Sequence, residues 1–351
     1  MMRRLATAFV IVVGVLIPAR PAAAHSVTGV QPTNYRSQII GVTPATPGLT
    51  VVLLDLGSRV RLTWHGPDEV VVIDYDGGPY LRIGPGGVFE NRRSSMASTP
   101  SGAAPTSTTV TPAPAVAAPA PDWHRVSAGS TATWKDRRSQ WQGPQPASVA
   151  AHTGRAQVVG QWVIPMRRAD TDIAVDGRVT WVPPPSAAPW LVAALLLAIL
   201  IAPLGLLRRW GPPLSAVAAL LLANDIVHSV GNAMAARGSV PGIVFKVVVG
   251  GLALTAAWVA ALWAVPALQR QRVGGLFVAG FAIFAMLMIS GLGDSLSLGR
   301  SELPYAFAPV MARAAITLAI GGSVGLLGAI VVVLRRHPEY WLADARQPAP
   351  R

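Results

Sequence analysis

The fold is decided by the stretch Trp190-Leu-Val-Ala-Ala-Leu-Leu-Leu-Ala-Ile-Leu-Ile-Ala-Pro-Leu-Gly-Leu-Leu207, which Arg208 and Arg209 follow at once. It holds no charged residue and nears the ~20 apolar residues that an α-helix needs to cross the hydrocarbon core of a bilayer. Four comparable apolar runs follow at about 213–236, 242–267, 273–294 and 306–334. Residues 190–334 therefore predict a bundle of five transmembrane helices.

The composition agrees with a protein that faces lipid. Charged residues make up 13% of the chain, about half of the ~25% usual in globular proteins. Lysine and arginine number 29 against 16 aspartate and glutamate residues. A nucleic-acid-binding protein would gather such cations in one patch. Here they are scattered or flank apolar runs, so nucleic acid is not an expected partner. The absence of cysteine excludes disulfides and thiolate chemistry.

Basic residues in the short loops predict the orientation of the bundle. Pairs of arginines follow the first, third and fifth apolar runs, at Arg208 and Arg209, Arg270 and Arg272, and Arg335 and Arg336. The other two loops carry only Arg237 and Arg300. Cytoplasmic loops are enriched in lysine and arginine. The tail at 335–351 is therefore predicted to be cytoplasmic, and the chain before the first helix is predicted to lie outside.

The N-terminus has the order of a secretory signal peptide. Arg3 and Arg4 precede an apolar run at 5–17, and Ala22-Ala23-Ala24 offers a small-residue cleavage site. Residues 1–24 are therefore expected to be removed, which makes His25 the first residue of the mature chain. An uncleaved anchor is the alternative, and in both cases the segment that follows Ala24 is exported.

An exported β domain is predicted at 25–182. Polar and apolar residues alternate at 59–64, as in a strand with one buried face, and Asp176-Gly177 matches a two-residue hairpin turn. Short strands at this spacing favour an antiparallel sandwich. The Ala/Pro/Ser/Thr-rich stretch at 97–121 predicts a disordered loop, and a proline-rich hinge at 183–189 ends the domain. The fold class is therefore α+β by domain, with an antiparallel β-sandwich before the five-helix bundle.

Polar residues inside the predicted helices are the main functional candidates. Asp225, His228 and Asn232 stand at i, i+3 and i+7, on one face of the second span. The other members of this intramembrane set, which map to the same outer half, are Lys246, Asp294 and Arg313. Ionisable residues in a membrane are costly and face the bundle interior. Three interpretations stay open: structural ion pairs, a polar pocket for a proton, metal or small anion, and separate snorkelling of some members.

A copper site is a second candidate. A mature N-terminal His25 offers its free amine and its imidazole to one Cu(II) ion, as in small periplasmic copper carriers. Those carriers add a histidine from an Asp-x-His element, and Asp122-Trp-His124 has that form. His65 and His152 are the alternative histidine ligands. No other cofactor is expected.

No enzyme signature is present in the sequence. It contains no P-loop, no His-Glu-x-x-His metal helix and no Gly-x-Ser-x-Gly nucleophile elbow. The exported domain does hold acidic residues, such as Asp74, Asp76 and Glu90, but their spacing nominates no catalytic pair. The protein is therefore expected not to be an enzyme.

Three segments resemble a known group of proteins. They are Gly29–Tyr35 (GVQPTNY), Asp74–Arg82 (DYDGGPYLR) and Val88–Ser94 (VFENRRS). Together they resemble actinobacterial multi-pass membrane proteins with a signal peptide, an exported β domain and a C-terminal helical bundle. Many members of the group carry a histidine-rich Trp-His-Asp-His-Arg-x-His-Trp element. The matching stretch here is Trp134–Trp141, and three of its residues replace those histidines: Lys135, Arg137 and Gln140. The resemblance therefore carries no metal site over to this stretch.

Two hypotheses about function follow. The first is a non-enzymatic protein of the plasma membrane whose exported β domain binds an envelope protein or cell-wall component. The second is transport or copper handling through the intramembrane polar residues. Convergence of Asp225, His228 and Asp294 on an open cavity would favour the second hypothesis. Their burial in closed pairs would favour the first.

Overall fold

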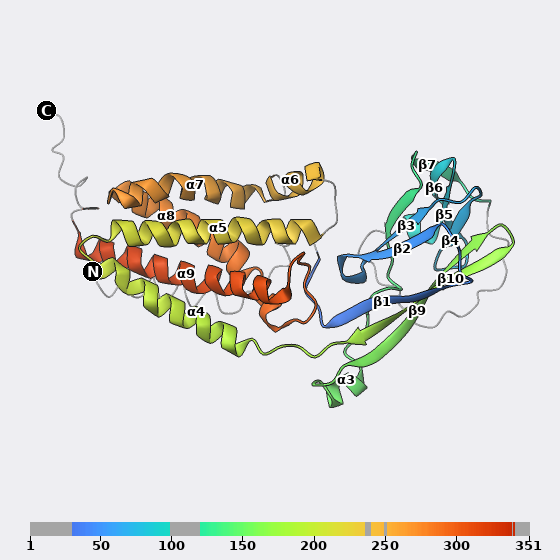
Figure 1. The fold of residues 1–351 in the computed structure, drawn as a ribbon, viewed down its shortest axis with the longest axis horizontal. Coiled ribbons are helices and arrows are strands. Elements are labelled where there is room, and N and C mark those ends of the chain that lie inside the picture. Colours follow the sequence, from blue (N-terminus) through green and yellow to red (C-terminus); the bar gives the residue numbers. More distant parts are fainter. Residues whose placement is uncertain (1–29, 99–119, 236–239, 249–250, 339, 341–351) are drawn as a thin grey trace. The chain divides into compact units, whose positions relative to one another are not determined.

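A computed structural model describes residues 30–98, 120–235, 240–248, 251–338 and 340 (Figure 1). The chain divides into two compact units, a β unit at Thr33–Pro184 and a helical unit that includes Pro185–Arg351. The predicted signal peptide lies outside the described residues, as does most of the predicted cytoplasmic tail.

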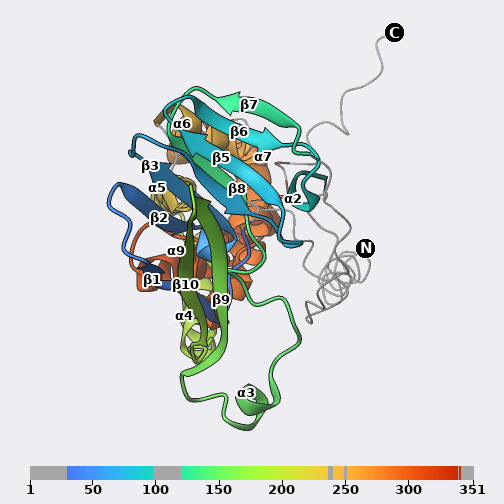
Figure 2. The same ribbon diagram turned by 90° about the vertical axis from the view of Figure 1, so that its right-hand side faces the viewer.

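The described residues of the β unit form ten strands in two antiparallel sheets. Across the seven-stranded sheet the order is β1 (Tyr35–Thr43), β10 (Thr171–Trp181), β9 (Gln157–Arg168), β4 (Val70–Ile73), β5 (Pro79–Gly84), β6 (Gly87–Asn91) and β7 (Trp123–Ser127). The three-stranded sheet has the order β2 (Leu49–Leu54), β3 (Arg59–Trp64) and β8 (Thr131–Lys135). Figure 2 shows β1, β10 and β9 side by side.

The alternation of polar and apolar residues explains which face of each strand is buried. In β3, Val60, Leu62 and Trp64 are buried, whereas the residues between them are half-exposed. Side chains that alternate along a strand point to opposite faces of the sheet. The buried residues of β3 share one hydrophobic core with residues of the larger sheet, among them Ile83 and Ile164. Both sheets therefore bury one face in a common core.

The predicted hairpin turn at Asp176-Gly177 is wrong. Both residues lie inside β10, and the turn that joins β9 to β10 lies between Arg168 and Thr171. The glycine has a packing reason, because a Cβ atom at Gly177 would lie 2.1 Å from the indole of Trp162. Glycine within a strand often marks such a close approach.

The described part of the β unit also holds three short helices: η1 (Asp55–Gly57), α2 (Ser95–Ser98) and α3 (Ala147–Ala151). The first two residues of the predicted disordered loop at 97–121 are the last two residues of α2. Residues 99–119, the body of that loop, lie outside the described residues.

Among its described residues, the helical unit contains five helical segments that are long and apolar enough to cross a membrane. The chain is therefore a multi-pass membrane protein. The segments are Ala188–Leu206 (α4, Ala188–Ile201, and η2, Ala202–Leu206), Gly211–Ala235 (α5), Leu252–Gln269 (α7), Val273–Gly299 (α8, Val273–Met286, with η3, Leu287–Leu292, and η4, Ser295–Gly299) and Pro309–Arg336 (α9). Their ribbons run side by side in Figure 1.

The third apolar run is interrupted. The sequence predicts one helix at 242–267, but the structure has α6 at Val240–Val248 and a separate α7 that begins at Leu252. Gly251, the residue before α7, has a non-helical backbone. Glycine disfavours a helix interior because it loses more conformational freedom than any other residue.

Small residues set the packing between α4 and α9. A Cβ atom at Gly321 would lie 2.3 Å from the carbonyl oxygen of Ala194, and one at Gly325 would lie 2.7 Å from the Cβ of Ile201. Glycines four residues apart allow two helix backbones to approach closely in a membrane.

Candidate functional site

The candidate site is a group of buried polar side chains in the helical unit, here called the polar cluster: Asp225, His228, Asn232, Trp258, Ser290 and Asp294. The α5 helix supplies the first three on one face, because residues three and four apart are neighbours on a helix surface. Asp225 and His228 are almost completely buried, at 1% and 3% exposure. The structure therefore gathers four of the six residues that the sequence nominates.

His228 links α5 to the end of the fourth span. Its Nε2 atom lies 2.9 Å from Oδ2 of Asp294, and the amide nitrogen of Asn232 lies 3.5 Å from the same oxygen. A consistent arrangement has both nitrogens donating to an ionised Asp294 carboxylate. The imidazole then carries a hydrogen on Nε2, and its Nδ1 atom is buried without a hydrogen-bond partner.

Asp225 is bound to a different helix. The indole Nε1–H of Trp258, on α7, donates to Oδ2 of Asp225. Ser290, in the π-helical segment η3, is a buried neighbour of the same carboxyl group. The other carboxyl oxygen, Oδ1, is buried and has no partner. Asp225 thus joins α5 to α7, whereas pairing by opposite charge alone would give it Lys246 or Arg313 as a partner.

Sequence reasoning overlooks Trp258, Ser290 and Tyr305. A tryptophan in the middle of an apolar run is one available signal, because a buried indole N–H needs an acceptor. Ser290 is marked only in the folded structure, by its place in a π-helical segment. Such segments are rare, and where they occur they often lie at functional sites. No local pattern marks Tyr305, which lies between two spans.

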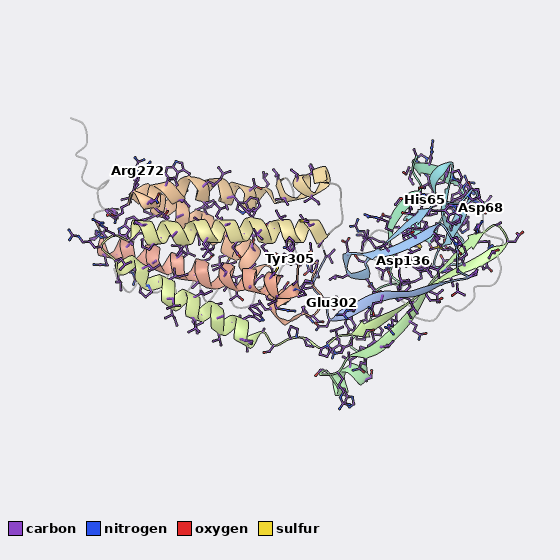
Figure 3. The ribbon with its side chains drawn as sticks, in the orientation of Figure 1. His65, Asp68, Asp136, Arg272, Glu302 and Tyr305 are labelled. Atoms are coloured by element: carbon purple, nitrogen blue, oxygen red, sulfur yellow. The ribbon has the colours of Figure 1, made fainter. Side chains whose placement is uncertain are left out.

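Tyr305 covers the imidazole of His228. The two rings stack with centroids 5.4 Å apart and an interplanar angle of 28°. Gly231 makes this contact feasible, because a Cβ atom there would lie 2.3 Å from the Tyr305 ring. Burial raises the pKa of the Tyr305 hydroxyl. Figure 3 shows Tyr305 towards one end of the bundle and Arg272 at the opposite end.

Arg313 and Lys246 do not belong to the described cluster. The Nη2 atom of Arg313 donates to the backbone carbonyl of Arg300 at 2.7 Å, and its Nε is buried without a partner. No ion pair joins it to Asp225 or Asp294 within the described part of the chain. Lys246 lies in α6, and its side chain lies outside what the structure describes.

The copper hypothesis rests on residues that the structure describes only in part. His25 lies outside the described residues. His124 is exposed on β7 opposite Glu90, and the backbone N–H of Asp122 donates to Oδ1 of Asn91 at 2.9 Å. Across residues 30–98, 120–235, 240–248, 251–338 and 340, no three His, Asp or Glu side chains converge as metal ligands.

Comparison with models of protein families, with curated proteins and with solved structures yields no match. Function is therefore inferred from the geometry of the sites. In the polar cluster, α5 is tied to α7 through Asp225 and to the end of the fourth span through Asp294. Such bonds hold helices together, and the titratable groups among them can also hold or pass a proton.

Proposed function

We propose that this chain is a non-enzymatic protein of the plasma membrane whose exported β domain binds a partner of the cell envelope, a protein or a cell-wall component. The observation that carries this proposal is that the titratable side chains of the polar cluster are buried and bonded to one another or to neighbouring helices. Asp225 and His228 are buried and bonded to Trp258 and Asp294. Closed pairs favour a bundle that anchors the β domain over one that opens to a substrate.

An uncovered face of the β unit suits partner binding. In the seven-stranded sheet, Trp162 and Ile164 of β9 point into the core, so Val163 between them points outward and is exposed. Val158 and Ile40 are exposed strand residues as well. Exposed apolar residues on one face are typical of interaction surfaces. The core shared by the two sheets supports a β-sandwich as the fold of this domain.

The arginine pairs support the orientation proposed for the bundle. The side chain of Gln271 donates to the carbonyl of Arg208 at 3.2 Å, and Arg336 donates to the carbonyl of Leu206. These bonds bring the loop after α4, the loop after α7 and the end of α9 to one end of the bundle. Six arginines gather there: Arg208, Arg209, Arg270, Arg272, Arg335 and Arg336. Lysine and arginine accumulate on the cytoplasmic side, so the opposite end faces outward.

The three resembling segments support membership of the actinobacterial group. Asp74–Arg82 and Val88–Ser94 overlap most of β5 and β6, and Asp74 stabilises the turn before β5. Its Oδ1 accepts the backbone N–H of Gly78 at 2.8 Å, and its Oδ2 accepts the Ser94 hydroxyl at 2.8 Å. Asp74, Gly78 and Ser94, which belong to the resembling segments, thus stabilise the local fold, and this supports a fold in common with the group.

The decisive experiment combines topology with cross-linking. A reporter active only outside the cytoplasm should be active after Pro185 and silent after Trp341. A photo-reactive residue at Val163 should then yield covalent adducts with an envelope component in intact cells. The matched control is a photo-reactive residue at Thr171, an exposed position at the β9–β10 turn. Equal labelling from both positions, or an active reporter on the tail, would contradict the proposal.

A second candidate function is transport or copper handling through the polar cluster. The buried, unpartnered atoms Oδ1 of Asp225 and Nδ1 of His228 favour it, because such atoms are rare in a purely structural network. Binding of Cu(II) by the full-length mature protein tests whether the protein handles copper. One residue added before His25 should abolish most of that binding, because the free amine is no longer adjacent to the imidazole. Unchanged binding would remove the N-terminal site.

A further inference from the structure

The outward face of the seven-stranded sheet carries a row of side chains that the core does not use. In β5, Leu81 and Ile83 are buried in the core, so Arg82 between them points outward. Arg82 lies directly opposite Phe89 of β6, and Phe89 lies opposite Arg125 of β7. Figure 2 shows these three strands side by side. Arg82, Phe89 and Arg125 therefore form one row across the outward face.

Aromatic rings position the guanidinium group of Arg82. Its Cζ atom lies 4.6 Å from the centroid of Phe89 and 5.0 Å from that of Trp123, on β7. Aromatic faces attract a guanidinium group and fix the orientation of its plane. The nearest acidic group is Glu69, whose Oε1 atom lies 3.6 Å from Nε of Arg82, and that nitrogen is buried without a hydrogen-bond partner. The rings therefore hold this side chain without occupying its hydrogen-bond donors.

Arg125 extends over β6 from the other side. A Cβ atom at Gly87 would lie 3.0 Å from Nε of Arg125. Gly87 stands two residues before Phe89, on the same face of β6. Arg125 is exposed, and it forms no hydrogen bond or ion pair with any residue that the structure describes. Two guanidinium groups thus converge over β6, one from β5 and one from β7, with donors that are free to bind a ligand.

The chemistry of this arrangement suits an acidic sugar. The planar fork of a guanidinium group matches a carboxylate or a phosphate through two parallel hydrogen bonds. Trp123 is half-buried, and its indole N–H forms no hydrogen bond within the described chain. An aromatic ring packs against the C–H face of a sugar, and an indole N–H donates to a hydroxyl group. Because β7 is the last strand of the sheet, an extended polymer can pass the site at an open edge.

We propose that Arg82, Arg125 and Trp123 form a binding site for the acidic groups of a cell-wall polysaccharide. This inference rests on the proposed export of the β domain, and it narrows the envelope partner to an anionic glycan. The two arginines bind an acidic group above β6, and Trp123 contacts the sugar that carries it.

The row of side chains continues beyond Arg82 and suits a polymer with repeated charges. Val71 of β4 lies opposite Arg82 on one side and opposite Arg167 of β9 on the other. Arg82 and Arg167 are therefore two strands apart, about 9–10 Å along the row. Arg167 pairs with Asp172, but both side chains are largely exposed, and such pairs are weak. A second acidic group of the same polymer can therefore take the place of Asp172.

Titration of the full-length protein in detergent with polygalacturonate, a polymer of carboxylated sugars, tests the site. The wild type should bind polygalacturonate and should not bind dextran, a neutral polysaccharide. Arg82→Gln and Arg125→Gln should each weaken binding at least about tenfold, because each removes a charge-assisted fork. The matched control is Arg178→Gln, an exposed arginine on the same outward face of β10. It removes the same charge away from the row and should change the affinity less than about twofold.

Further variants and probes separate a built site from general attraction between charges. Arg82→Lys keeps the charge and loses the planar fork, so it should weaken binding as much as Arg82→Gln does. If the Arg82 variants fail to fold, the exposed variant Arg125→Gln decides. Full binding by Arg82→Lys, an equal loss in Arg178→Gln, or a wild type that does not bind polygalacturonate would overturn the proposal. Equal binding of polyglutamate would overturn the assignment to a glycan.

The binding assay and the topology reporters fail separately, because binding in detergent does not depend on which side of the membrane the β domain occupies. An active reporter after Pro185 without polygalacturonate binding would overturn this inference and leave the exported domain. Binding together with a silent reporter after Pro185 would overturn the proposed export and, with it, the cell-wall source of the ligand.

Discussion

The two units of this protein bury different kinds of side chain. The core of the β unit is built around large residues, among them Trp64, Trp162 and Ile164. The core of the helical unit is rich in alanine, at positions that include Ala218, Ala257, Ala261, Ala264, Ala279, Ala282 and Ala329. One chain therefore uses two packing solutions.

The difference follows from the solvent of each unit. In water, the free energy gained by burying apolar surface grows with the area of the side chain. Between helices in lipid this driving force is absent, because lipid tails are as apolar as leucine, and close contact of backbones takes its place. The lipid-crossing helices accordingly expose large residues such as Leu195, Leu200 and Phe281. Truncation of a buried side chain should therefore be the most damaging change in the β unit, and enlargement of a small residue should be damaging in the bundle.

The largest expected effect is truncation in the β core. Trp162→Ala should lower the free energy of unfolding by about 3–5 kcal/mol, because a buried aromatic side chain is removed and a cavity remains. Denaturant unfolding of the full-length protein in detergent, followed by near-ultraviolet circular dichroism, measures it. The control is the exposed neighbour Val163→Ala, expected to change stability by less than ~0.5 kcal/mol. Similar losses for both would contradict a core built on large side chains.

Enlargement in the bundle should be the next largest effect. Gly321→Val places atoms against the backbone of Ala194 and should cost about 1–3 kcal/mol through overpacking. Thermal unfolding in detergent measures the loss. Gly280→Val is the matched control, because a Cβ atom there would meet nothing within 4 Å. If the two variants melt alike, helix propensity and not the contact between α4 and α9 determines the result.

A smaller difference is expected between a buried polar contact of the bundle and an exposed ion pair of the β unit. Asp294→Asn removes the carboxylate that accepts a hydrogen bond from His228 and should destabilise the bundle by about 0.5–2 kcal/mol, the range of polar contacts between membrane helices. Asp172→Asn removes an exposed pair with Arg167 on the β9–β10 hairpin. Solvent screens that pair, so its loss should stay below ~0.5 kcal/mol. Thermal melts of the two variants in one detergent compare them, and a larger effect for Asp172 would reverse the expected order.

The last prediction concerns Tyr80, whose substitution should have only a small effect at neutral pH. Burial and the neighbouring Glu90 carboxylate raise the pKa of the Tyr80 hydroxyl in the β unit. The unfolded chain then releases this proton first, so stability is kept below pH about 10 and falls as the pH rises further. Tyr80→Phe should flatten that alkaline decline and change stability at pH 7 by no more than ~1 kcal/mol. Melting temperatures between pH 8 and pH 11 measure it, and a parallel decline in the variant would exclude Tyr80 as the cause.

Part of the polar cluster could be predicted from the sequence. The i, i+3, i+7 spacing of Asp225, His228 and Asn232 places them on one helix face whatever the rest of the chain does. Their partners could not be predicted, because Trp258 and Asp294 are brought to that face by two other spans. Arg313 was a reasonable partner by charge, yet the structure directs it to a backbone carbonyl.

The sequence by itself determined the features that depend on local composition. Long apolar runs predicted five spans, and alternation predicted strands such as β3, because hydrophobic length and period are read residue by residue. The tertiary structure alone decided the strand position of Gly177 and the partners of Asp225. Both depend on what another segment places nearby: the indole of Trp162 for Gly177 and that of Trp258 for Asp225. Contacts between residues far apart in the chain leave no periodic trace in the sequence, so only the folded chain reveals them.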